Sequence, residues 1–91
     1  MKYEIERTSQ FKRDYKLAVK CGYDVSRLKE TIRLLADGAE LSMEYRDHSL
    51  AGDYSGYRAC HIKPDWLLVY KITEEVLLLT LYCTGTHSDL F

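Results

Sequence analysis

Cysteine is scarce in this 91-residue sequence, and its three copies cannot all pair. Cys21, Cys60 and Cys83 lie far apart along the chain. An odd count excludes a fully paired disulfide framework, and no two of them have the Cys-x-x-Cys spacing of a zinc site. This usage is typical of a reduced, cytosolic protein.

Long hydrophobic runs and flexible linkers are also missing. The longest apolar stretches, Trp66–Tyr70 and Val76–Leu79, are far shorter than the ~20 residues that span a bilayer. The N-terminal residues have no apolar core typical of a signal peptide. With one proline, five glycines and no repeat, the chain offers no linker. We therefore expect a single domain over residues 1–91, without a membrane segment.

A basic excess, which nucleic-acid-binding proteins usually have, is absent. The net charge is −1 and the isoelectric point is about 6.3. The cations are nevertheless concentrated in the first third, at Lys12, Arg13, Lys16, Lys20, Arg27, Lys29 and Arg33. An RNA site in this chain would have to depend on a few local cations rather than on a field of the whole molecule.

The N-terminal half has the pattern of a short strand followed by two helices. Residues 2–6 alternate as in a strand, and Thr8 or Ser9 can cap a helix that stops at Gly22. Asp24 or Ser26 can cap a second helix, which Gly38 ends. Its apolar stripe is Val25, Leu28, Ile32 and Leu35. Two short helices joined by a tight connection predict an antiparallel hairpin.

The C-terminal half has the pattern of consecutive strands after a polar loop. Periodicity is lost over residues 39–56, and three strand-like runs follow at 57–62, 66–72 and 76–82. Their short connections require antiparallel neighbours, and the tail 84–91 has no period of its own. The fold class we expect is α+β, an antiparallel sheet with an N-terminal helical hairpin on one face (β-α-α-β-β-β).

Histidine is the residue type in this sequence that best suits acid–base catalysis, and only three histidines occur. His48 lies in the loop, His61 on a strand and His87 in the tail. Histidine can both take and give a proton near neutral pH. Internal cleavage of RNA needs a base for the 2′-hydroxyl, an acid for the departing 5′-oxygen, and stabilisation of the phosphorane.

Other interpretations of the same residues exist. His61, Asp65 and His87 could form a histidine–carboxylate metal site, but their ligands are scattered in sequence. Cys60 could be a nucleophile, although neighbours on a strand face opposite sides, so Cys60 and His61 cannot face each other. Cys60 is more simply a core residue. Tyr57 shares a strand face with His61 and could stack on a base.

Two segments together resemble a known family. The run YRDHSLAGDYSGYRACHIKPDWLLVYKI at 45–72 and the tail TGTHSDLF at 84–91 are similar to the RelE superfamily, closest to its YafQ branch of toxin–antitoxin messenger RNA endonucleases. The strand and helical hairpin before them fit the same order, so the resemblance covers nearly the whole chain. It implies an enzyme, a ribosome-dependent endoribonuclease that cuts messenger RNA in the A site without a metal or cofactor.

The resemblance also assigns residues by their place in the motifs. It implies that His87 is the general acid, that Asp65 or His48 is the base, and that His61 orients the scissile phosphate. Phe91 matches the terminal aromatic residue, which would hold the substrate. Many relatives have arginine before Thr-Gly-(Thr/Ser)-His, whereas this chain has Cys83. Arg58 or Lys63 would then bind RNA in its place, or activity would be lower.

The resemblance further implies partners and a compartment. These are a cognate antitoxin of the RelB/DinJ type, in a heterotetramer, together with the ribosome and messenger RNA in the cytoplasm. Three alternatives remain: a weakened or inactive binding module on the same scaffold, a gyrase-poisoning toxin, and an unrelated α+β domain. The gyrase hypothesis leaves the histidines and Asp65 unexplained.

Overall fold

A computed structural model describes all residues, 1–91. Short 3-10 turns at 43–45, 52–54 and 74–76 connect the regular elements. In chain order, those elements are β1 (Glu4–Arg7), α1 (Ser9–Lys20), α2 (Ser26–Ala36), β2 (His48–Ser49), β3 (Arg58–Lys63), β4 (Trp66–Thr73), β5 (Leu78–Gly85) and α3 (His87–Leu90).

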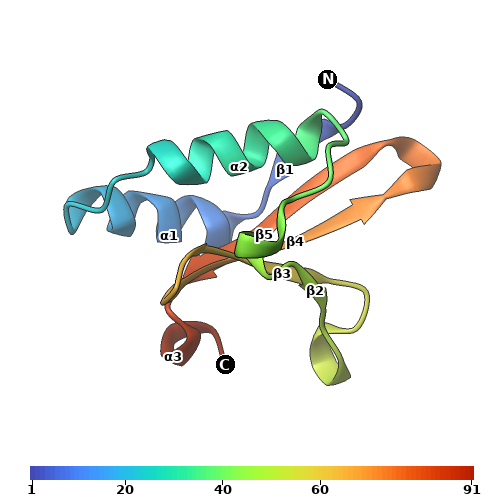
Figure 1. Cartoon of the computed structure of the whole chain (residues 1–91). Coiled ribbons are helices and arrows are strands. Elements are labelled where there is room, and N and C mark those ends of the chain that lie inside the picture. Colours follow the sequence, from blue (N-terminus) through green and yellow to red (C-terminus); the bar gives the residue numbers. More distant parts are fainter.

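The strands form one five-stranded sheet in the order β1-β5-β4-β3-β2. The helices α1 and α2 lie on one side of this sheet, and α3 lies on the other (Figure 1). The predicted α+β class with its helical hairpin is confirmed. Two short elements, β2 and α3, add to the predicted order, and β1 pairs with β5 in parallel. No tight turn joins β1 to β5, so nothing in the local sequence requires the antiparallel direction there.

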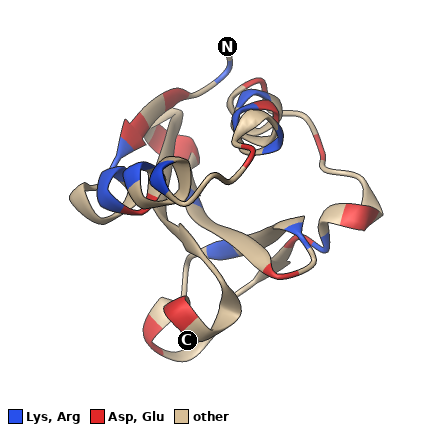
Figure 2. Ribbon diagram, turned by 90° about the vertical axis from the view of Figure 1, so that its left-hand side faces the viewer, with Lys and Arg blue, Asp and Glu red and all other residues tan.

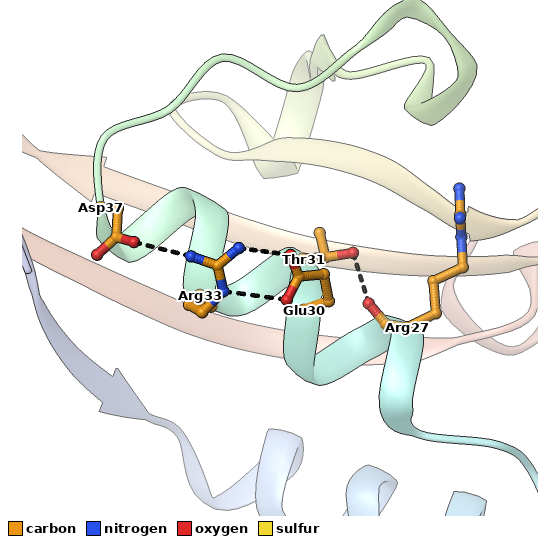
Figure 3. Close-up of polar contacts among 5 residues, drawn as sticks. All are labelled: Arg27, Glu30, Thr31, Arg33 and Asp37. Atoms are coloured by element: carbon orange, nitrogen blue, oxygen red, sulfur yellow. Dashed lines mark hydrogen bonds and ion pairs between the residues drawn. The ribbon is translucent and has the colours of Figure 1, made fainter.

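The start of α1 follows its predicted capping signal, whereas α2 has Val25 at the N-cap position and no side-chain cap. The Thr8 hydroxyl accepts a hydrogen bond from the Phe11 amide at 3.0 Å and caps α1. Asp24 accepts from the Ser26 amide at the start of α2. Along α2, Arg33 contacts Glu30 and Asp37 on the exposed side (Figure 3). No helix combines the length and apolar character that crossing a membrane would need.

Strand alternation divides the apolar side chains between the two sheet faces. The face under the helices carries the larger cluster, in which α2 packs Leu28, Ile32 and Leu35 against the strands. The opposite face, which we call the open face, carries a smaller cluster. Its members are Ala59, Leu67, Val69 and Cys83, with Leu50, Tyr57, Tyr82 and Leu90 at its margin. Cys60 is fully buried on the helix side, as predicted for a core residue.

Thr84 links β4 and β5 through a buried polar chain. Its hydroxyl accepts a hydrogen bond from the Trp66 indole Nε1 at 2.8 Å and donates one to the Leu67 carbonyl at 2.7 Å. Both Trp66 and Thr84 are buried. A buried donor without a partner is costly, so this hydroxyl holds the indole in one place.

We predict that Thr84→Val lowers the free energy of unfolding by about 1–3 kcal/mol, because it leaves the Trp66 N–H unpaired in the core. Urea unfolding followed by tryptophan fluorescence measures the change. Thr84→Ser keeps the hydroxyl and is the control, expected to lose less than about 1 kcal/mol. Equal losses in the two variants would show that the hydroxyl contributes nothing.

Candidate active site

The open face brings a strand histidine into register with the start of the C-terminal tail. His61 pairs with Leu67 across β3 and β4, and Leu67 pairs with Gly85 across β4 and β5. Paired residues on adjacent strands share a sheet face. The strand spacing therefore places His61 about 10 Å from Gly85, and His87 follows Gly85 by two residues.

His48 lies beside His61 on this face. His48 pairs with Ala59 across β2 and β3, and the ring centroids of His48 and His61 are 6.4 Å apart. Each ring has Nδ1 near a backbone carbonyl: His48 with Arg46 at 2.8 Å, and His61 with Pro64 at 3.2 Å. A carbonyl only accepts, so Nδ1 carries the hydrogen in both rings, which leaves each Nε2 without a protein partner.

His87 and Phe91 form a second pair on α3. Their ring centroids are 5.2 Å apart. A capping box between Thr86 and Asp89 starts this single helical turn. Tyr54 anchors the turn, since its ring lies 5.2 Å from that of Phe91 and its hydroxyl donates to the Leu90 carbonyl at 3.3 Å. The tail, which has no period in the sequence, is therefore ordered by capping and aromatic packing.

Asp65 occupies the turn between β3 and β4. It is exposed, and it follows Pro64, whose carbonyl fixes His61. The structure thus brings His48 and His61 together on the open face, and it places His87 beside Phe91 in the tail, which leaves that face after Gly85. No hydrogen bond or ring contact joins these two pairs or ties Asp65 to them. No three His, Cys, Asp or Glu side chains converge closely enough to hold a metal ion.

A buried-side network fixes the backbone that precedes His48. Asp47 accepts hydrogen bonds from the Tyr70 hydroxyl at 2.6 Å and from the Arg58 guanidinium, whose Nη2 lies at 3.1 Å. The bond to Asp47 raises the pKa of Arg58. Burial, followed by the contact with Asp47, raises the pKa of Tyr70. Asp47 is therefore held between two donors, and His48 follows it directly.

This network corrects the expected role of Arg58. Arg58 pairs with Tyr70, whose side chain packs on the helix side of the sheet, whereas His61 is three residues further along β3 and faces the open side. An odd separation on a strand places two side chains on opposite faces. Arg58 binds Asp47 instead of reaching toward the histidines, so it does not stand in for an arginine at position 83.

Lys63 and Cys83 are the other two residues that bear on the missing arginine, and they differ in exposure. Lys63 is exposed at the end of β3 and has no acidic partner within 4 Å, so it remains available to an anion. Cys83 is 6% exposed and packs among the open-face apolar residues. Burial, and then the charge of Asp14, raises the pKa of Cys83 to about 11. The thiol is an apolar wall of the site rather than a nucleophile.

The fold and this face together define a class of protein: a small α+β domain with a candidate acid–base site of histidines on the sheet face opposite the helical hairpin. Comparison with known families agrees with that class. The family model described as "Bacterial toxin of type II toxin-antitoxin system, YafQ" matches residues 3–91. The chain belongs to the YafQ family of these toxins.

Individual relatives match over nearly their whole length. The mRNA interferase toxin YafQ of Escherichia coli K12 is 43% identical over 89 residues, covering 97% of this chain and 95% of the relative. A chain of the E. coli DinJ–YafQ complex superposes on this one with a TM-score of 0.90 at 42% identity, and the match covers 98% of this chain and 98% of that one. A metal-bound toxin from Helicobacter pylori superposes with a TM-score of 0.91 at 40% identity, covering 98% of this chain and 99% of that one.

We predict that Asp47→Ala destabilises the protein by about 2–3 kcal/mol, because it leaves the buried Tyr70 hydroxyl and the Arg58 charge without their shared acceptor. The melting temperature should fall by roughly 10–20 °C for a chain of this size. Glu44→Ala is the control: its pair with Arg27 is exposed, at 3.6 Å, and is worth less than about 1 kcal/mol. Similar melting of both variants would contradict the network's importance.

We predict that only Cys21 reacts with a thiol reagent in the folded protein at pH 8. Cys21 is exposed, whereas burial raises the pKa of Cys60 to about 12 and that of Cys83 to about 11. Less than about 0.1% of either buried thiol is then ionised. Mass spectrometry counts the labels, and Cys21→Ser should remain unlabelled until denaturant is added. Labelling of Cys83 at the rate of Cys21 would show an open, reactive thiol.

Proposed function

We propose that this chain is an endoribonuclease toxin, an mRNA interferase, that cuts messenger RNA in the ribosomal A site by attack of the ribose 2′-hydroxyl and without a metal ion. The observation that carries the proposal is the arrangement of His48 and His61, whose rings lie together on the open face with both Nε2 atoms unoccupied. The 43% identity to an mRNA interferase toxin supports the same activity.

The proposed chemistry uses proton transfer at each end of the broken bond. Neutral His48 accepts the 2′-hydroxyl proton at Nε2, since its Nδ1 is already bonded to the Arg46 carbonyl. Asp65, exposed beside His61, is the alternative base. The 2′-oxygen attacks phosphorus and the 5′-oxygen leaves with a proton from His87. The products are a 2′,3′-cyclic phosphate and a 5′-hydroxyl.

His61 and Phe91 position the substrate in this proposal. The Pro64 carbonyl fixes the ring of His61, so its Nε2 can orient the scissile phosphate. Phe91 is 48% exposed and can accept a base on its ring face. Tyr57 and Tyr82, 4.9 Å apart, extend the aromatic surface of the open face.

The proposed partner is an antitoxin of the RelB/DinJ type, bound in a heterotetramer in the cytoplasm, where translating ribosomes occur. The support is the DinJ–YafQ complex, whose YafQ chain has the same fold as this protein. A catalytically inactive, antitoxin-binding module is the competing interpretation. It predicts antitoxin binding without cleavage.

We predict that His87→Ala slows cleavage by roughly 100- to 10,000-fold, the range for loss of a general acid. Primer extension on messenger bound to ribosomes gives the rate. His87 is exposed, so the melting temperature should not change. Ser88→Ala, an exposed neighbour on α3, should cut normally. A folded His87→Ala variant that cuts at the wild-type rate would remove His87 from the mechanism.

The same primer-extension assay, repeated with toxin that has been treated with a chelator, tests whether cleavage needs a metal ion. The chelator must be selective for transition metals, because ribosomes need Mg²⁺. We expect cleavage to be unchanged after the toxin has been treated and dialysed. Loss of activity that zinc or copper restores would overturn the metal-free mechanism while leaving the nuclease assignment intact.

A further inference from the structure

A basic pocket of about 380 Å³ adjoins the histidine pair at the edge of the sheet. Strand β2 pairs with β3 only at Arg58 and Ala59, so the rest of β3 has no strand partner on that side. The pocket is lined there by Arg27, Glu44, Arg46, His61 and Lys63, with backbone near Pro64. We propose that it binds the RNA backbone phosphate next to the scissile one. This inference rests on the proposed function.

The charge of the pocket suits a phosphodiester. Three cations line the pocket with a single carboxylate, that of Glu44, which already pairs with Arg27 at 3.6 Å. Outside the lining, hydrogen bonds from Ser26 and then the charge of Lys63 lower the pKa of Asp24. Arg46 and Lys63 have no acidic partner within 4 Å. Ile62 is the one apolar residue of the lining, so charged and polar groups make up most of the pocket surface. It can recognise a phosphate by charge and N–H donors.

Arg27 is held in place before any ligand arrives. Its Nε donates to the Ile62 carbonyl, and its guanidinium lies 4.7 Å from the centre of the Tyr45 ring. Figure 3 shows this side chain extending away from the Arg33 cluster of α2. A guanidinium already fixed by packing loses little side-chain entropy when it binds an anion. Arg27 therefore forms a rigid wall of the pocket.

Arg46 connects the pocket directly to the histidine pair. Its backbone is left-handed, with φ of 49°, a conformation that costs a residue with a side chain of order 1 kcal/mol. In that conformation the Arg46 carbonyl accepts the His48 Nδ1–H bond, while the side chain lines the pocket. His61 also belongs to both the pair and the pocket. A phosphate bound here is therefore adjacent to the reacting nucleotide.

The distribution of cations gives the experiment its control. Figure 2 shows Lys and Arg on the two long helices as well. Lys12 and Lys29 are exposed there, on the side of the sheet away from the histidines. K12Q/K29Q removes two positive charges, the same number as the pocket variant R46N/K63Q. Asparagine tolerates the left-handed backbone at position 46 and keeps the carbonyl that fixes His48.

The experiment measures messenger cleavage on ribosomes over a range of toxin and salt concentrations. For R46N/K63Q we expect the half-saturating toxin concentration to rise roughly 10- to 100-fold, with the saturating rate within threefold of wild type. The salt dependence of log affinity should become shallower by about 0.7 for each phosphate that the variant no longer neutralises. K12Q/K29Q and the charge-preserving R46K/K63R should stay within threefold of wild type.

Three results would overturn the pocket assignment while wild-type cleavage stands. In the first, R46N/K63Q resembles K12Q/K29Q. In the second, R46K/K63R loses as much as R46N/K63Q. In the third, R46N/K63Q keeps its RNA affinity but loses the antitoxin, which would make the pocket a protein-binding site.

Failure of the proposed function gives a different pattern, in which the wild-type chain does not cut at all. Binding of a short single-stranded RNA oligonucleotide then tests the pocket independently of cleavage. We expect R46N/K63Q to bind this RNA roughly 10- to 100-fold more weakly than K12Q/K29Q does. Equal affinities of the two variants would reject the pocket.

Discussion

The Asp47 carboxylate is the contact on which the geometry of the site depends. It joins the loop to two central strands through Tyr70 and Arg58, from the side of the sheet that the helices cover. The next residue, His48, then emerges on the opposite side, beside His61. Asp47, on the helix side of the sheet, thus sets the position and direction of the His48 imidazole on the open face. The loop around it has little regular structure of its own, so this anchoring replaces the rigidity that a strand or helix would supply.

The site combines rigid and lightly held parts. His61 is on a strand within the sheet, whereas His87 and Phe91 are held by one helical turn, a capping box and the ring of Tyr54. Elements with few buried contacts open more readily than core strands. The side chain of His87 can therefore change position more readily than that of His61, which the strand and the Pro64 carbonyl hold.

Much of the fold followed from local patterns, because capping residues and strand alternation act over short distances. Thr8 and Asp24 mark the helix starts, and the three C-terminal strands have short connections. The parallel pairing of β1 with β5 depends on contacts about 75 positions apart, for which no local signal exists. The order in the tail also escaped prediction, since a single turn started by the Thr86–Asp89 box is too short to show a helical period.

The motifs in the sequence pointed to His48, His61 and His87 as members of one site. The structure places His48 beside His61 on the open face, and it brings Gly85, two residues before His87, into register with them. Parity along β3 would have separated Arg58 from His61 in advance, as it did Cys60. Arg27 and Arg46 could not be found this way. They meet Lys63 only because the sheet edge, the left-handed residue and the start of α2 come together in three dimensions.

The pairing of the first strand with the last has a consequence for biosynthesis. The only strand neighbour of β1 is β5, whose paired residues lie 74 positions further along the chain, so β1 stays unpaired until β5 has been synthesised. Contacts between such distant segments form late and slowly. His87, on α3, follows β5 in the chain. The five-stranded sheet and the turn that carries His87 therefore cannot be complete before β5 and the residues after it have been synthesised.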